Sequence, residues 1–391
     1  MDIGILGGGI AGLSVALALH RTGHRPRVYE RGAAPATMGA GVTLWPNAGF
    51  VLDALGLLPD VAAAGGRPRA MRRYDNAGHA LGSLDISALD RLMGYPTHTI
   101  LRRDLLAVLL AHAARAGIPV EYGHRAVAIE PDADGRAAAR FENGAVVRAD
   151  LLVGADGRMD SVARRFVVGD NTPVYQGFVN WIGIASGPGL AEDMAIQDYW
   201  GVGERFGCVA VRPDLVYWAG PRPGRWPPRS RARPARGGRG PVRRLGRPDR
   251  APHPGHARRR GAPDRRARPG YPGGLAPRQC AAGGDAAHAP LPTSGQGACQ
   301  ALEDAWHLAR CLAGAPRDLD AALSAFTALR QPKTAALTEQ ARVYARGLFE
   351  RDPQPAACAT SRSRPSMPGR RCGRWRAPGG RLACGGGGER G

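Results

Sequence analysis

The chain has 391 residues and a formal net charge of +21, and this length is enough for two ordinary domains with buried cores. The charge is concentrated in two segments. Residues 221–282 contain 18 Arg, no Lys and two acidic residues, and residues 353–391 contain 8 Arg and one acidic residue. The rest of the chain carries a net charge of −2, which argues against a folded basic surface for nucleic acid or a membrane.

These two segments are unusual in other respects. Residues 221–282 contain 13 Pro and 10 Gly but only five large apolar residues, too few to offset the entropy of ordering the backbone. We therefore predict that 221–282 is disordered and that the tail 346–391 is equally anomalous. Because Arg, Pro, Gly and Ala have codons rich in G and C, we hypothesise that both segments are read out of frame, with the frame restored near Gly283. The alternative is a natural disordered basic insert and tail.

Cysteine usage and hydropathy suggest a compartment. The seven Cys include no C-x-x-C pair, so neither a disulfide framework nor a zinc site is expected. The N-terminus lacks the pattern of a secretory signal, and no run of about 18 apolar residues could form a membrane span. We expect a cytoplasmic protein that binds neither membranes nor nucleic acid, and its oligomeric state stays open.

The first 30 residues contain a glycine fingerprint in its full context. A predicted strand (Asp2–Leu6) leads into Gly7-x-Gly9-x-x-Gly12, a helical segment follows, and Glu30 ends the next strand. Such glycines permit a tight turn, close approach of a pyrophosphate and close helix packing, while the acid accepts ribose hydroxyls. The pattern predicts a dinucleotide site but does not choose between NAD and FAD. The alternative is a strand–helix turn without a ligand.

The middle of the chain is predicted to be rich in strands. An apolar strand from Asp150 ends in Asp156-Gly157, and an Asp at the carboxyl end of such a strand is a plausible cofactor contact. Taken alone, however, it would be only a turn. Short strands of a meander are predicted at 120–123, 126–130, 137–142 and 146–148, and strands of a second sheet at 176–185 and 208–218.

A second motif lies near the end of the recognisable sequence. Gly284-Asp285 begins a run that continues through Pro292 and Gln296-Gly297 into an apolar helix. Backbone N–H groups at such a helix start suit an anion or a developing negative charge. The residues 277–283 before the motif are not expected to form a buried strand.

In this order and spacing, the three motifs resemble the FAD-dependent aromatic hydroxylases, single-component flavin monooxygenases of the para-hydroxybenzoate hydroxylase type. The resemblance covers residues 1–219 and 284–345. It implies an α/β fold with a Rossmann-like FAD-binding domain (1–70, 98–170 and 284–345). Interleaved with it is an α+β substrate domain built on a mostly antiparallel sheet (71–97 and 171–220).

The resemblance also assigns roles to individual residues. Gly7, Gly9, Gly12 and Glu30 would bind the ADP half of FAD, and Arg102 would head a helix that contacts the cofactor. Asp156 and Gly157 would contact FAD and, transiently, NAD(P)H. Asp285 would bind ribityl or ribose hydroxyls. Pro292, Gln296 and Gly297 would lie along the isoalloxazine ring.

Within this family the chain most resembles the urate, salicylate and 3-hydroxybenzoate hydroxylases. Arg205 and Tyr217 stand at the separation of the substrate-contacting Arg and Tyr of urate hydroxylases, and a guanidinium suits an anionic planar substrate. The implied reaction uses NAD(P)H and O2 and hydroxylates a small aromatic or purine-like acid through a flavin hydroperoxide. The alternatives are a non-functional frameshifted member of the family and a flavin-dependent reductase or dehydrogenase that does not hydroxylate.

Overall fold

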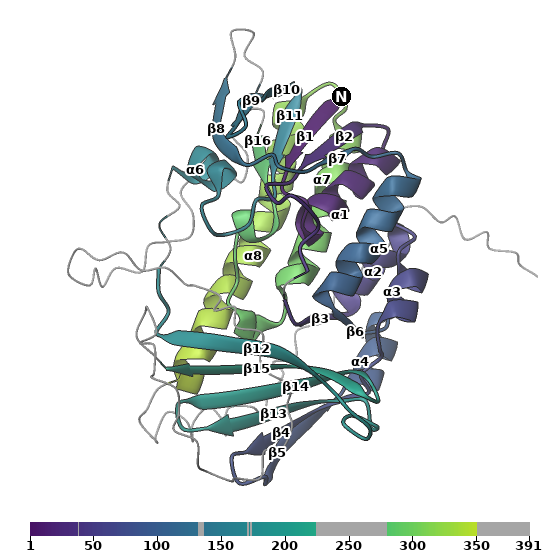
Figure 1. The fold of residues 1–391 in the computed structure, drawn as a ribbon, viewed down its shortest axis with the longest axis vertical. Coiled ribbons are helices and arrows are strands. Elements are labelled where there is room, and N and C mark those ends of the chain that lie inside the picture. The colour runs from purple at the N-terminus through teal and green to yellow at the C-terminus, as the bar shows by residue number, and fades with distance from the viewer. Residues whose placement is uncertain (38, 132–136, 170–171, 173, 224–279, 350–391) are drawn as a thin grey trace, which may run out of the picture.

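The computed structural model describes residues 1–37, 39–131, 137–169, 172, 174–223 and 280–349 (Figure 1). Most of the two Arg-rich segments lies outside these residues, so their predicted disorder and the frameshift hypothesis stay untested. The described part folds around two sheets, with a long C-terminal helix running beside both (Figure 1).

The first sheet has five strands that are all parallel to their neighbours, in the order β16-β11-β1-β2-β7. Its inner strands β1 and β11 are short apolar runs, as expected when both faces of a parallel sheet are covered. The strands are β1 (Asp2–Leu6), β2 (Arg25–Tyr29), β7 (Val120–Glu121), β11 (Leu151–Gly154) and β16 (Cys280–Ala282).

Helices cover one face of this sheet, and a small sheet covers the other. Ile3, Ile5 and Val153 pack with the helices, whereas Leu152 and Tyr29 pack with the small antiparallel sheet β10-β9-β8 and with helix α6. On the helical side lie α1 (Ile10–Arg21), α2 (Pro46–Ala54), α3 (Leu58–Ala64), α5 (Arg102–Arg115) and α7 (Gly297–Gly314). On the other side lie β8 (Ala126–Pro131), β9 (Ala137–Phe141), β10 (Val146–Ala149) and α6 (Val162–Val168).

The second large sheet has six strands in the order β12-β15-β14-β13-β4-β5. Only the β13–β4 pair is parallel, so the sheet is mostly antiparallel. Its strands are β4 (Ala70–Asp75), β5 (Ala80–Asp85), β12 (Phe178–Ser186), β13 (Ala195–Gly201), β14 (Glu204–Arg212) and β15 (Leu215–Pro223). Helix α4 (Ile86–Met93) follows β5, and the Asp85 side chain caps it by accepting from the N–H of Ala88.

Two elements join the sheets. The antiparallel pair β3 (Gly41–Leu44) and β6 (His98–Leu101) lies between them (Figure 1), and the Thr99 hydroxyl donates to the carbonyl of Ala210 on β14. The 31-residue helix α8 (Leu319–Phe349) packs against α7 and reaches the second sheet, where Phe349 contacts Phe178. The candidate functional site is therefore expected between the two sheets.

The structure confirms the predicted fold class but corrects four local predictions. A strand, β16, does form before Gly284, because three small apolar residues (Cys280–Ala282) fit against β11 in parallel register. β7 joins β2 instead of the meander. The segment predicted as one strand at 208–218 is a hairpin, since Pro213 and Asp214 lie between β14 and β15. Helix α8 also runs to Phe349, four residues into the predicted tail.

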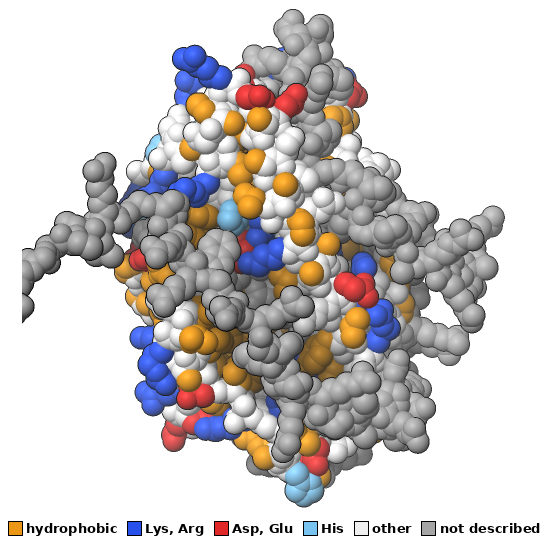
Figure 2. Space-filling view, turned by 180° about the vertical axis from the view of Figure 1, so that it is seen from behind, with side chains coloured by type: hydrophobic (Ala, Val, Ile, Leu, Met, Phe, Trp, Pro, Cys, Tyr) orange, Lys and Arg blue, Asp and Glu red, His pale blue; other side chains and the backbone are white. Residues whose placement is uncertain are grey.

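The surface matches the charge distribution read from the sequence. On the face shown in Figure 2, basic and acidic side chains of the described residues lie in small interspersed groups. No helix within the described ranges is both long and apolar enough to cross a membrane.

Candidate cofactor and substrate site

The glycine fingerprint forms a tight turn from β1 into α1, and two of its three glycines are required by close backbone contacts. Gly7 has a φ of 112°, and a Cβ there would overlap the carbonyl of Ala155. A Cβ at Gly12 would overlap the carbonyl oxygen of Gly7, whereas a Cβ at Gly9 would meet nothing within 4 Å. The turn is therefore closed on the protein side and open at Gly9, where a phosphate group can approach the backbone.

Glu30 reaches this turn from the end of β2. Its Oε2 accepts a 2.7 Å hydrogen bond from the N–H of Gly8, and its Oε1 accepts one of 2.8 Å from the N–H of Gly32. An ionised carboxylate can accept about four hydrogen bonds, so both oxygens keep capacity for ribose hydroxyls. The carboxylate stands at the open side of the glycine turn, where the fingerprint predicts it.

Asp285 lies in the short 3-10 helix η1 (Gly284–Ala286), directly after β16. It is half-buried, and its Oδ1 lies 3.9 Å from the position a Cβ would take at Gly297, in the first turn of α7. Among the described residues its carboxylate has no hydrogen-bond or ion-pair partner. An unpaired, half-buried carboxylate beside a helix start is suited to bind the hydroxyls of a ligand.

The predicted ring-binding segment leads into α7. Pro292 begins the 3-10 helix η2 (Pro292–Ser294), and Gln296 is the N-cap of α7, whose first residue is Gly297. The Gln296 side-chain oxygen accepts from Asn47 and from Gln300, both at 3.2 Å. The first turn of α7 contains no acidic residue, so its partial positive charge is not neutralised within the helix.

Asp156 and Arg102 occupy different surroundings. The Asp156 carboxylate caps α6, because it accepts from the hydroxyl of Ser161 at 2.6 Å and from the N–H of Val162 at 2.7 Å. Burial outweighs these bonds and raises its pKa. Gly157 has a φ of 79° in the following turn. Arg102 starts α5, and its side chain lies against Gly39 without a hydrogen-bond or ion-pair partner among the described residues. Their cofactor contacts stay predictions.

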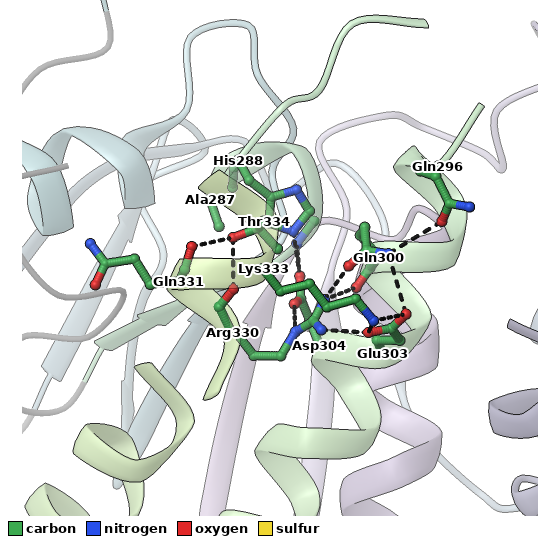
Figure 3. A network of polar contacts seen from close by, with 12 residues as sticks. Ala287, His288, Gln296, Gln300, Glu303, Asp304, Arg330, Gln331, Lys333 and Thr334 are labelled. Atoms are coloured by element: carbon green, nitrogen blue, oxygen red, sulfur yellow. Dashed lines mark hydrogen bonds and ion pairs between the residues drawn. The ribbon is translucent and has the colours of Figure 1, made fainter. Parts of the chain in front are cut away.

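A buried charge cluster behind α7 was not predicted (Figure 3). Arg330 on α8 is 1% exposed. Its Nε donates to Asp304 at 2.7 Å, its Nη1 to Glu303 at 2.5 Å, and its Nη2 to the side chain of Gln300 at 2.7 Å. The cluster thus ties the first half of α7 to α8 through one guanidinium.

The same carboxylates also reach the cofactor segments. Asp304 Oδ2 accepts from the N–H of Gly284 at 2.8 Å and contacts Nε2 of His288 at 2.7 Å. Burial alone would raise the pKa of Asp304, but the charge and hydrogen bond of His288, together with the charge of Arg330, outweigh it and lower the pKa. For Glu303, burial is likewise outweighed, and Asn47, Lys333 and Arg330 lower its pKa. The cluster fixes the Gly284-Asp285 turn relative to α7.

Tyr217 connects the second sheet to β3. Its hydroxyl lies 2.8 Å from the Thr43 hydroxyl, and its ring lies so close to Gly41 that a Cβ there would overlap it. Burial raises the pKa of Tyr217, so the phenol stays protonated. Thr43 in turn accepts, through its carbonyl oxygen, a 3.5 Å hydrogen bond from the Cys299 thiol on α7. Tyr217 is thereby linked to the first turn of α7.

Arg205 lies on the same face of the sheet as Tyr217. Val209 is the cross-strand partner of Tyr217 and stands four residues from Arg205 on β14, and strand residues separated by an even number share a face. The Arg205 side chain is paired with a carboxylate. Its Nε and Nη2 donate to the two carboxylate oxygens of Asp198 on β13, at 2.7 and 3.1 Å.

Aromatic rings surround this ion pair. The Trp200 indole N–H donates to Asp198 Oδ2 at 2.8 Å, and the Arg205 guanidinium lies 6.0 Å from the ring centroid of Tyr344 on α8. Burial opposes the charge of Arg205, but the charge and hydrogen bonds of Asp198 outweigh it and raise the pKa of Arg205. The carboxylate of Asp198 thus balances the charge of Arg205.

Two hollows border the described residues away from these segments. One, of about 370 Å³, lies between α1 and α7 near Arg21 and Trp306. The other, of about 440 Å³, lies against β4 and β5 beside Arg73 and Gly82. Neither is lined by the glycine turn or by the other predicted cofactor residues.

A parallel sheet whose carboxyl edge carries a glycine turn, an acidic residue hydrogen-bonded to that turn and an Asp unpaired among the described residues is typical of dinucleotide-binding proteins. The FAD binding domain family model matches residues 1–222. The chain is 33% identical to 3-amino-4-hydroxybenzoate 2-monooxygenase of Streptomyces cremeus, over 87% of this chain and 86% of that protein. It is 31% identical to the FAD-dependent urate hydroxylase of Mycolicibacterium vanbaalenii, over 90% of each.

Further matches agree in fold. Aurachin C monooxygenase/isomerase of Stigmatella aurantiaca is 32% identical, over 83% of this chain and 84% of that protein. The crystal structure of Klebsiella pneumoniae HpxO complexed with FAD and uric acid has a TM-score of 0.72, with 25% identity, covering 93% of this chain and 92% of that one. The chain therefore belongs to the family of FAD-dependent monooxygenases, and it is an oxidoreductase with an FAD-binding domain.

The residues present fit FAD. The open backbone at Gly9 and the Glu30 carboxylate suit the ADP half, and the unpaired Asp285 beside Gly297 suits the polyol chain. The sequence missed the residues that depend on strand register and on long-range contacts, namely Asp198, Tyr344 and Arg330. The Glu303-Asp304 pair within an apolar helix was the one signal that could have indicated buried cations nearby.

Proposed function

We propose that this protein hydroxylates a small aromatic or purine-like acid, using FAD, NAD(P)H and O2. When bound and reduced, FAD activates O2 for transfer of one oxygen atom to an electron-rich ring, and the second oxygen atom leaves as water. The similarity to a 3-amino-4-hydroxybenzoate monooxygenase and to a urate hydroxylase supports a ring substrate of this kind.

One observation carries the proposal: the predicted substrate residues flank the predicted ring-binding segment on two sides. Tyr217 reaches α7 through Thr43 and its contact with Cys299. Arg205 is connected to η2 through helix α8. Its guanidinium lies against the ring of Tyr344, and one turn earlier in the helix the carbonyl of Ala341 accepts a 3.3 Å hydrogen bond from the Thr293 hydroxyl of η2. A planar ring held between Arg205 and Tyr217 would face residues 292–297.

The chain's own groups would bind and orient the ring. The Tyr217 hydroxyl, held by Thr43, can donate one hydrogen bond to a substrate oxygen or accept one from it. Arg205 uses Nε and Nη2 for Asp198, which leaves Nη1 as a donor for a ring carbonyl or carboxylate. Tyr217 and the aromatic rings of Trp200 and Tyr344 also keep water from this part of the sheet face.

The test is a turnover assay with purified FAD-loaded protein. We expect NAD(P)H oxidation to accelerate when urate, salicylate or 3-hydroxybenzoate is added, together with a product heavier by one oxygen atom. NAD(P)H oxidation that no ring accelerates, without hydroxylated product, would favour a reductase or dehydrogenase. Colourless protein that takes up no FAD would favour a non-functional gene product.

Tyr217→Phe sharpens the assay, and Tyr199→Phe is its matched control. Tyr199 lies on β13 next to Trp200 and therefore on the opposite face, where its hydroxyl donates to Gln197 at 3.0 Å. Losing one hydrogen bond of about 1 kcal/mol predicts a roughly fivefold to tenfold lower kcat/KM for Tyr217→Phe. Tyr199→Phe should leave kcat/KM unchanged. Equal effects of the two substitutions would contradict the placement of the substrate.

A further inference from the structure

The charge balance of the second sheet identifies an additional binding residue. Asp198 and Arg205 neutralise each other through two hydrogen bonds. The register of β4 with β13 pairs Arg73 with Asp198, so Arg73 stands on the same face as Arg205 and Trp200. A substrate that carries a negative charge would gain little from a guanidinium whose charge Asp198 already balances.

Within the described part of the chain, Arg73 is a cation of this face that no carboxylate pairs with. Its guanidinium carbon lies 5.4 Å from the ring centroid of Trp200. Its Nε is buried and has no hydrogen-bond partner, and a long contact of 4.0 Å from Nη2 to the sulfur of Met71 is its one hydrogen bond among the described residues. A buried guanidinium donor without an acceptor is costly unless a ligand completes it.

The neighbours of Arg73 do not supply that acceptor. Asp75 lies two residues along the same strand, but its carboxylate serves the following turn, where it accepts from the N–H groups of Ala77 and His79 and contacts the His79 ring. Gly82 is the cross-strand partner of Arg73 on β5, so no side chain stands directly opposite Arg73 on that strand. The 440 Å³ hollow adjoins at this point.

We propose that Arg73 receives the negative charge of the substrate, while the neutral Asp198–Arg205 pair supplies hydrogen bonds to the rest of the ring. The substrate class is then a planar ring with a single negative charge, and Arg73 distinguishes it from its neutral analogue. Trp200 positions the guanidinium by stacking, since a cation over an indole face is held in place. This inference rests on the proposed function and adds the residue that selects for charge.

Matched acid and amide ligands test the inference by calorimetric titration of the FAD-loaded protein. The probes are salicylate against salicylamide, and 3-hydroxybenzoate against 3-hydroxybenzamide. We expect the wild type to bind the acid of at least one pair about tenfold or more tightly than the amide, as a charge-assisted hydrogen bond implies. Arg73→Met, which keeps an apolar side chain over Trp200, should abolish this preference without weakening amide binding.

Two further variants make the result decisive. Arg212→Met on β14 removes an exposed arginine that pairs with Asp214 at the hairpin turn, and it should retain the preference for the acid. In the double variant Arg73→Met with Asp198→Asn, no carboxylate at position 198 balances the charge of Arg205. The preference for the acid over the amide should therefore return. An Arg73→Met protein that still prefers the acid would overturn the inference and leave the proposed function intact. A wild type that binds neither member of any pair, and no urate either, would overturn both.

Discussion

Replacing Arg330 by Met should destabilise the protein strongly, because it leaves two buried carboxylates without their shared cation. Glu303 keeps Lys333, at 2.6 Å, and Asp304 keeps His288. Gln300 loses the donor to its side-chain oxygen. Removing one partner of a buried ion pair costs about 3–5 kcal/mol, which is a large part of the roughly 5–15 kcal/mol by which a typical domain is stable.

The effect is measured by thermal unfolding and by denaturant titration. A loss of this size lowers Tm by on the order of 10 °C in a protein of this length. Arg330→Lys keeps the charge but loses the planar guanidinium that donates to three residues at once. The stability of this variant should therefore lie between that of the wild type and that of Arg330→Met. The control is Arg342→Met on the same helix, whose guanidinium is 3.7 Å from Glu339 and exposed; it should change stability by less than about 0.5 kcal/mol.

One result would refute the reasoning. If Arg330→Met lost no more stability than Arg342→Met, the buried cluster would contribute no net stabilisation, and the carboxylates would be neutral in the folded protein. Folded-state protonation of Asp304 is directly measurable by carboxyl NMR, which separates that explanation from compensation by repacking.

Two other predictions concern the same region. Asp285→Asn should weaken FAD binding about tenfold or more, because an amide replaces the unpaired carboxylate beside Gly297, whereas Asp53→Asn on the exposed side of α2 should not. Fluorescence titration of the apoprotein with FAD measures the affinity of each variant. Equal affinities of the two variants would remove Asp285 from the site. The pKa values of Asp304 and Glu303 are lowered by folding, so the stability they confer is fully present above about pH 4–5 and is lost as the pH falls through their folded values. Urea unfolding between pH 3 and pH 7 should show this decline, shifted to higher pH in Arg330→Met; curves that coincide would contradict the role of the guanidinium.

The part of the fold that depends on local sequence was predictable. The β1 strand, the three glycines and Glu30 lie within 30 residues, and each performs a steric or hydrogen-bonding task that its residue type already implies. The mostly antiparallel second sheet followed from the family resemblance. The structure bears out the fold class, and the family match and the relatives bear out the flavin monooxygenase lineage.

The remaining errors have physical causes. β16 was excluded because Cys280–Ala282 are small and follow a Pro- and Arg-rich segment, yet a three-residue strand needs little side-chain volume when β11 supplies the backbone partners. β7 was assigned to the meander because two residues carry no information about which sheet they join. Sequence alone indicates which strands exist better than it indicates their pairing.

For the same reason, the sequence could not predict the site residues whose positions depend on how strands pair. Arg205 was identified from its resemblance to an arginine that binds substrate, but its partner Asp198 is visible only once the register of β13 and β14 is known. The cluster around Arg330 joins residues about 26 positions apart on two helices. Nothing in a linear pattern specifies that these two helices pack face to face at that level.

Helix α8 gives this arrangement a mechanical consequence. Arg330 anchors it beside the cofactor segments, and Tyr344 meets the ion pair of the second sheet about 21 Å farther along the helix axis. At that length, a tilt of about 5° about the buried anchor displaces Tyr344 by about 2 Å. Pro332 lies two residues after the anchor and removes one backbone hydrogen bond there, so bending is easiest next to the fixed end. The helix thus connects the buried cluster directly to the residues proposed to hold the substrate.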